Sequence, residues 1–133
     1  MTTIKNPIIY IVDDDADDRE FIMQALSAIG LFGTFMEFDD GQKVLDYLKS
    51  YPMAYPDLIL LDLNMPVKNG FDTLQEVKSD ESLRSIPIII LTASSKVEDE
   101  KVCFRHGCEQ YYQKPLSIEG YKELAGYIIT YLH

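Results

Sequence analysis

The segment Leu58-Ile59-Leu60-Leu61-Asp62 sets four apolar residues directly before a carboxylate. Such a run is too short for a helix and is typical of a strand buried on both faces of a parallel sheet. Similar runs occur at Ile8–Val12 and Ile88–Leu91. The mixed segment Thr34–Phe38 suits an edge strand, and Gln110–Gln113 is a weaker candidate that is closed by a Lys-Pro pair. The sequence therefore predicts five short strands.

Stretches of helical period fill the intervals between these strands. Gly30 stands where a left-handed residue ends a first helix, and Ser117 is placed to cap the last one. A fourth helix between Val97 and His106 has a ragged apolar face, so we expect its packing to be the weakest. The alternation predicts a doubly wound (βα)5 fold of the α/β class, with helices on both faces of the sheet. The apolar positions of the other helices are Phe21, Ile22, Ala25, Leu26 and Ile29; Val44, Leu45 and Leu48; Phe71, Leu74 and Val77; and Ile118, Tyr121, Leu124, Ala125, Ile128, Ile129 and Leu132.

The composition fits one globular domain. The chain has 133 residues, a formal net charge of -10 and a pI near 4.5. Because phosphate backbones are bound mainly by clustered Lys and Arg, this balance argues against a nucleic-acid partner.

No segment approaches the ~20 apolar residues that span a bilayer. Cys103 and Cys108 fit no disulfide framework. We therefore expect a cytoplasmic protein, without a membrane partner, in which the two thiols are buried.

Polar side chains follow the predicted strands at the point where each strand ends. Asp13 and Asp14 follow the first strand, Asp62 the third, Thr92 the fourth and Lys114 the fifth. Parallel strands end along one edge of the sheet, where open α/β folds bind ligands. Clustered carboxylates resist joint ionisation unless a cation lies between them, and a few carboxylates with water suit Mg²⁺. The edge is therefore predicted to hold Mg²⁺ with an ammonium opposite, an arrangement suited to a phosphoryl group.

Each of these residues also has an ordinary structural interpretation. The run from Asp13 to Asp15 could cap the first helix, Thr92 could be a turn residue, and Lys114 could be a solvated surface charge. Asp62 is harder to explain in this way, because a carboxylate that closes a buried strand is costly without a partner. The joint occurrence of these groups at four strand ends favours the functional interpretation.

The chain resembles response regulator receiver domains over about residues 7–132, and the ordered set of motifs is specific although each motif alone is weak. A chemotaxis member of that family has the strand order 2-1-3-4-5 of flavodoxin-like folds, so the resemblance implies this order here. The matching pieces are Ile11-Val12-Asp13-Asp14 with Arg19, Leu61-Asp62-Leu63-Asn64-Met65-Pro66 with Asn69-Gly70, Leu91-Thr92-Ala93-Ser94, and Tyr111-Tyr112-Gln113-Lys114-Pro115.

The resemblance implies that Asp62 accepts a phosphoryl group from a phosphohistidine. Mg²⁺, for which Mn²⁺ is a substitute, would contact Asp14 and Asp62 directly and Asp13 largely through water. The backbone carbonyl of Asn64 would complete the protein ligands. The donor would be a sensor histidine kinase or a histidine phosphotransfer protein.

Further roles follow from the same resemblance. Lys114 and Thr92 would bind phosphoryl oxygens, and the ring of Tyr111 would turn when Thr92 moves inward. Asn64 and Ser94 occupy positions that tune how long the phosphate lasts. The family also suggests a cis peptide bond between Lys114 and Pro115.

Because the fifth predicted helix reaches the end of the chain, we expect one domain over residues 1–133 with no output domain. The protein would not be an enzyme beyond its own phosphorylation and dephosphorylation. Its output would pass to another protein through the fourth helix, fifth strand and fifth helix, where Tyr112, Tyr127 and Tyr131 are candidate anchors. The sequence leaves homodimer formation open.

Two other functional classes compete with this interpretation. A haloacid dehalogenase-type aspartyl-phosphate phosphatase also places an Asp and Mg²⁺ after a strand, but it needs a second acid where this chain has Asn64. A flavodoxin-type cofactor module needs a donor-rich loop after the first strand, where the acidic run from Asp13 to Asp15 would repel a phosphate.

Overall fold

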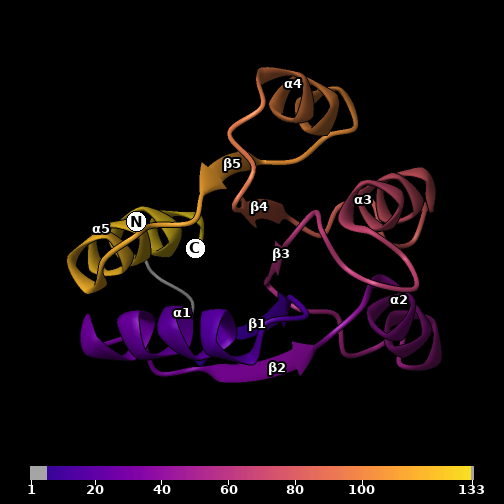
Figure 1. Cartoon of the computed structure of the whole chain (residues 1–133). Helices are drawn as coiled ribbons and strands as arrows, with labels where there is room; N and C mark the ends of the chain where they lie inside the picture. The colour runs from indigo at the N-terminus through magenta and orange to yellow at the C-terminus, as the bar shows by residue number, and fades with distance from the viewer. Residues whose placement is uncertain (1–5, 133) are drawn as a thin grey trace.

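The computed structural model describes residues 6–132 and places a parallel sheet between two layers of helices (Figure 1). The strands lie in the order β2-β1-β3-β4-β5, which confirms the order that the resemblance implies. All five predicted strands are present, and the fourth includes one further residue, Thr92. The strands are β1 Ile8–Val12, β2 Thr34–Phe38, β3 Leu58–Leu61, β4 Ile88–Thr92 and β5 Gln110–Gln113.

A helix follows each strand, as the sequence predicts. Figure 1 shows α1 and α5 on one face of the sheet and α2, α3 and α4 on the other. Gly30, just beyond α1, has φ +91°, and the side chain of Ser117 accepts a hydrogen bond from the amide of Gly120 at 3.0 Å. Both predicted helix ends are thereby confirmed. The helices are α1 Ala16–Ala28, α2 Gly41–Ser50, α3 Gly70–Ser79, α4 Val97–Arg105 and α5 Ile118–Ile128, followed by the 3₁₀ helix η1 Ile129–Tyr131.

The central strands are continuous apolar runs because the helical layers bury both of their faces. In β3, Leu58 and Leu60 pack with α1 and α5, while Ile59 and Leu61 pack with α2 and α3. Successive strand side chains point to opposite faces, so each strand contributes to both cores. Cys103 and Cys108 are free and buried in the core beneath α2 and α3, as expected.

Three of the predicted apolar positions lie closer to solvent than the helical period suggests. Phe21 of α1 and Ile118 of α5 are exposed because they lie at the margins of the face that each helix turns toward the sheet, and Ile29 is exposed as the C-cap residue beyond α1. The buried stripe of α1 is reduced to Ile22, Ala25 and Leu26. The prediction of these two helices was correct, and only the width of their apolar faces was overestimated.

Helix α4 has the weakest packing of the five, as predicted. Cys103 is its only buried residue, while Val97 and Phe104 are exposed. Its N-cap residue, Lys96, makes no side-chain hydrogen bond to the helix. The peptide bond between Lys114 and Pro115 is trans, which corrects the cis bond suggested by the family resemblance. Within residues 6–132, no helix has the length and apolar character needed to cross a bilayer.

Candidate functional site

Beyond the ends of β3 and β5, one further backbone hydrogen bond holds each chain segment beside its neighbouring strand, β1 and β4 respectively. The amide of Asp62 donates to the carbonyl of Val12 at 2.9 Å, and the amide of Lys114 donates to the carbonyl of Thr92 at 2.7 Å. Because Val12 pairs in register with Leu61, the next residues, Asp13 and Asp62, emerge together. The sheet itself therefore brings the predicted polar groups to one edge.

Lys114 lies at the centre of this crevice and contacts three carboxylates. Its Nζ is 2.8 Å from Oδ2 of Asp13, 2.7 Å from Oδ2 of Asp18 and 3.5 Å from Oδ2 of Asp62. The Lys114 side chain is only 13% exposed, so these ion pairs are shielded from water on most sides. The predicted counter-charge is in place, and Asp18 joins the site as an additional acid.

Three carboxylates form a group with the composition of a hard-cation site. Asp13, Asp14 and Asp62 each offer an oxygen, and these oxygens all lie within 4.8 Å of one another. Asp13 and Asp62 are buried, whereas Asp14 is exposed and leaves a path to solvent. A set made only of carboxylate oxygens, open on one side to water, fits Mg²⁺ or Mn²⁺. The donor set agrees with the metal that the sequence predicts.

Burial and the neighbouring charges shift the pKa values of Asp13 and Lys114. Burial raises the pKa of Asp13 to about 6, against the opposing hydrogen bond from Lys114. Burial alone would lower the pKa of Lys114, but its hydrogen bonds to Asp13 and Asp18 and the charge of Asp62 raise that pKa above its usual range. Lys114 is therefore a cation at every relevant pH, while Asp13 holds its proton more readily than an ordinary carboxyl.

Of the acidic residues that follow β1, one caps α1 and two do not. Oδ1 of Asp15 accepts hydrogen bonds from the amides of Asp17 and Asp18 at 2.9 and 3.2 Å, so Asp15 is the N-cap of α1. Asp13 and Asp14 do not cap the helix, although Oδ1 of Asp13 accepts the amide of Asp15. The structural alternative thus holds for Asp15, and Asp13 and Asp14 remain available to a metal.

The loop after β3 packs tightly against the backbone of Asp62. A Cβ atom added to Gly70 would lie 2.1 Å from the carbonyl oxygen of Asp62, and the amide of Gly70 donates to the carbonyl of Leu63 at 2.9 Å. Oδ1 of Asp62 also accepts the amide of Leu63 at 2.8 Å, which leaves Oδ2 directed toward Lys114. Asn64 is exposed two residues beyond Asp62. Asn69-Gly70 in the sequence therefore has a steric role in holding Asp62.

The predicted switch residues lie on the other side of the crevice. Thr92 is fully buried at the end of β4, and its Oγ1 accepts the amide of Ser94 over a long 3.5 Å. The hydroxyl of Tyr111 donates to the carbonyl of Ser94 at 3.1 Å. Oγ of Ser94 in turn donates to Oδ2 of Asp99, in the first turn of α4. A short chain of hydrogen bonds therefore connects the end of β4 with α4.

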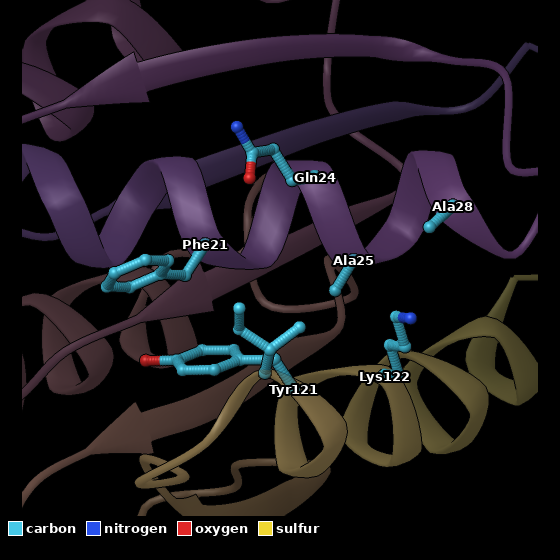
Figure 2. Close-up of a pocket in the computed structure, with 7 residues that line it drawn as sticks. Phe21, Gln24, Ala25, Ala28, Tyr121 and Lys122 are labelled. Carbon is cyan, nitrogen blue, oxygen red and sulfur yellow. The ribbon is translucent and has the colours of Figure 1, made fainter.

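A groove of about 200 Å³ between α1 and α5 lies outside this polar network (Figure 2). The rings of Phe21 and Tyr121 face each other across it, with centroids 5.5 Å apart. The walls are mostly apolar, and none of the carboxylates of the crevice lines the groove. The partial exposure of Phe21 follows from its position in the wall of this groove.

Comparison with known proteins identifies the family. The sequence model of the response regulator receiver domain family matches residues 9–125. The chain belongs to this family. It is similar to the chemotaxis protein CheY-3 of Vibrio cholerae, with 34% identity over 90% of this chain and 88% of the relative. In other relatives the matching receiver domain is a smaller part of the protein, for example 25% and 22% of the whole length.

Solved structures agree with this assignment. The phosphorylated cyanobacterial phytochrome response regulator RcpA superposes with a TM-score of 0.88 at 28% identity, covering 96% of this chain and 94% of that one. The Mn²⁺-bound form of the response regulator Rcp1 gives a TM-score of 0.84 at 25% identity, covering 92% and 91%. The protein is thus a phospho-accepting response regulator of two-component signalling, and receiver domains obtain their phosphoryl groups from histidine kinases. The phosphatase alternative finds no support in these comparisons.

Asp18 is the member of the site that sequence reasoning missed. The acidic residues from Asp13 to Asp15 receive an interpretation from the sequence, whereas Asp18 receives none. Asp18 lies in the first turn of α1, three residues after the N-cap residue Asp15, and its nearness in sequence to the acidic run was the available signal. Its importance depends on the direction in which α1 leaves β1, which brings its carboxylate to 2.7 Å from Lys114.

Proposed function

We propose that Asp62 of this receiver domain is the phosphoryl acceptor and that Asp13, Asp14, Asp62 and the carbonyl of Asn64 hold the Mg²⁺ that the transfer requires. The observation that carries the proposal is the position of the Asp62 carboxylate: its Oδ2 lies 3.5 Å from Nζ of Lys114, and one of its oxygens lies within 4.8 Å of oxygens of Asp13 and Asp14. The similar response regulator Rcp1 has a Mn²⁺-bound form, which supports the binding of a divalent ion by this chain.

The transfer proceeds by in-line attack. A carboxylate oxygen of Asp62 forms a bond to phosphorus as the bond from phosphorus to the histidine nitrogen breaks, and the imidazole leaves with the bonding electron pair. Mg²⁺ held by Asp13, Asp14 and Asp62 would supply positive charge to the phosphoryl oxygens. Lys114 supplies a second positive charge from the opposite side, and Gly70 holds the backbone of Asp62 in place. Such catalysis consists mainly of positioning and electrostatic stabilisation.

Phosphorylation changes the structure on the other side of the crevice, at Thr92 and Tyr111. The new phosphoryl oxygens hydrogen-bond to Thr92 and draw the β4–α4 loop inward, which changes the contact between Tyr111 and the carbonyl of Ser94. Asn64 and Ser94, each two residues beyond a site residue, control the access of water and so the lifetime of the acyl phosphate. Because α4 has a single buried residue, displacing this helix costs little free energy.

The output surface comprises α4, β5 and α5, and its target is another protein. Tyr112 and Tyr127 stack with centroids 6.1 Å apart, and Tyr127 is half exposed. Val97 and Phe104 add exposed apolar area on α4. We propose that the chain acts in the cytoplasm as a one-domain signalling protein without enzymatic turnover of other substrates, phosphorylated by a sensor kinase or a histidine phosphotransfer protein.

Incubation with acetyl phosphate followed by intact mass measurement tests the proposal. With Mg²⁺ the protein should gain the mass of one phosphoryl group, and with EDTA it should gain none. Asp62→Asn should stay unmodified, whereas Asp46→Asn, a change at an exposed carboxylate of α2, should be modified as the native protein is. Modification that persists in Asp62→Asn would overturn the assignment.

A further inference from the structure

The ammonium of Lys114 is shared unequally among the carboxylates around it. The contact with Asp18 is 2.7 Å long, whereas the contact with Asp62 is 3.5 Å. The Asp18 side chain is 26% exposed, so its ion pair lies at the mouth of the crevice rather than in free solvent. Lys114 is therefore held more closely by a residue of α1 than by the residue that it is to assist.

Asp18 differs from the other two partners of Lys114 because it does not belong to the candidate metal cluster. That cluster consists of Asp13, Asp14 and Asp62. When a cation binds there, it neutralises Asp13 and weakens the hold of Asp13 on Lys114. Asp18 receives no such neutralisation and continues to compete for the ammonium after the metal is bound.

We propose that Asp18 is a positioning residue that competes with the phosphoryl group for Lys114 and thereby limits how strongly the site holds that group. The proposal rests on the proposed function of Asp62. The extra carboxylate makes the crevice more negative, which favours the binding of a divalent cation and disfavours an incoming phosphoryl anion. Asp18 thus strengthens the binding of the metal ion and weakens the binding of the phosphoryl group.

Asp18→Asn tests this opposition, because it removes the charge and keeps the shape of the side chain. The matched control is Asp17→Asn, which changes the net charge equally in the same turn of α1. Asp17 is exposed, and within residues 6–132 its carboxylate makes no hydrogen bond or ion pair. The comparison therefore separates the contact with Lys114 from the effects of net charge and of the helix dipole.

One binding, one kinetic and one spectroscopic measurement give the expected signature. In Asp18→Asn the Kd for Mg²⁺, measured by calorimetry because the chain has no Trp, should rise about 3- to 10-fold. At saturating Mg²⁺, the second-order rate constant for phosphorylation by acetyl phosphate should rise by a similar factor, about 3- to 10-fold. In metal-free protein the ¹⁵Nζ resonance of Lys114 should shift. Asp17→Asn should stay within about twofold of the native protein in both constants, and Asp18→Glu should restore native values.

Different results would overturn the inference about Asp18 and the proposed function of Asp62. A fall of both Mg²⁺ affinity and phosphorylation rate in Asp18→Asn would mean that Asp18 merely supports the fold, and equality of Asp18→Asn with Asp17→Asn would mean that only net charge matters; either result overturns the inference. A native protein that acetyl phosphate does not modify would instead refute the proposed function of Asp62. The two failures are therefore distinguished by the native sample alone.

Discussion

The two sides of the crevice are built differently. On the side of α1 and α5, Lys114 is held by three carboxylates, α1 is capped by Asp15, and Ile22 and Leu26 of α1 are almost wholly buried. On the side of α4, the helix has one buried residue and no side-chain cap hydrogen bond. Hydrogen bonds of Ser94 with Asp99 and Tyr111 link the end of β4 to the side of α4.

This difference indicates a division of labour within one small domain. The side of α1 keeps the reacting groups fixed, because phosphoryl transfer depends on positions held within a fraction of an ångström. The side of α4 can move at low cost, because few buried contacts resist its displacement. Under the proposed function, the chemistry and the response to it therefore lie on opposite sides of the same sheet edge.

The largest expected effect is a contrast in stability between α1 and α4. Leu26→Ala should lower the free energy of unfolding by about 3 kcal/mol, because it removes a fully buried side chain. Phe104→Ala on α4 should lower it by less than about 1 kcal/mol, since this ring is 43% exposed. Urea unfolding followed by circular dichroism measures both values. Equal losses at the two positions would show that α4 is not the loosely packed helix.

Gly70 tests how tightly the loop after β3 holds Asp62. Gly70→Ala should destabilise the protein by about 2 kcal/mol, because the new methyl group must displace the backbone of Asp62. Phosphorylation by acetyl phosphate should slow at the same time. Gly126→Ala on α5 is the matched control, since nothing lies within 4 Å of its added Cβ, and it should stabilise the helix by about 0.5 to 1 kcal/mol. A neutral Gly70→Ala would refute the steric role.

Through Asp13, the free energy of unfolding should depend on pH. Its pKa is raised by burial from an ordinary value of 3.8 to about 6 in the folded protein, so between these values the folded state binds more protons than the unfolded state. The contribution of Asp13 to stability is therefore fully present below pH 3.8 and is lost as the pH rises to about 6, with a slope of at most about 1.4 kcal/mol per pH unit. Urea unfolding in EDTA at a series of pH values measures it.

The variant Asp13→Asn isolates this contribution from those of the other carboxylates. Above pH 6 in EDTA it should be more stable than the native protein, and added Mg²⁺ should stabilise it less than it stabilises the native protein. Identical pH profiles for the two proteins would contradict the burial of an ionised Asp13.

The smallest expected effect concerns the link between the end of β4 and α4. Asp99→Ala removes the acceptor of the Ser94 hydroxyl and should cost less than about 1 kcal/mol, because Asp99 is only partly buried. Amide hydrogen exchange in the first turn of α4 should nevertheless become faster. Glu98→Ala, an exposed acid one residue earlier, should leave that exchange unchanged. Equal exchange in both variants would show that the hydrogen bond does not restrain α4.

Much of this architecture follows from local sequence signals. Continuous apolar runs such as Leu58–Leu61 specify buried parallel strands, and the residue after each run is then placed at the shared edge. Asp62, Asp13 and Lys114 were found in this way, since backbone pairing alone determines their proximity. The weak packing of α4 was likewise visible in its ragged apolar face.

Other features depend on three-dimensional details that no local pattern contains. The exposure of Phe21 and Ile118 depends on how far α1 and α5 are rotated about their axes. The contact of Asp18 with Lys114 joins residues 96 positions apart and requires the actual path of α1. The trans bond before Pro115 differs from the family expectation, and nothing in the structure explains that difference.

Chemical mapping of the phosphorylated residue tests the central claim most directly. Protein treated with acetyl phosphate and Mg²⁺ is reduced with borohydride, which converts an acyl phosphate into an alcohol, and is then digested and sequenced by mass spectrometry. The converted residue should be Asp62, with Asp13, Asp14 and Asp18 unchanged. Conversion at any of those three carboxylates, with Asp62 intact, would contradict the assignment of Asp62 as the phosphoryl acceptor.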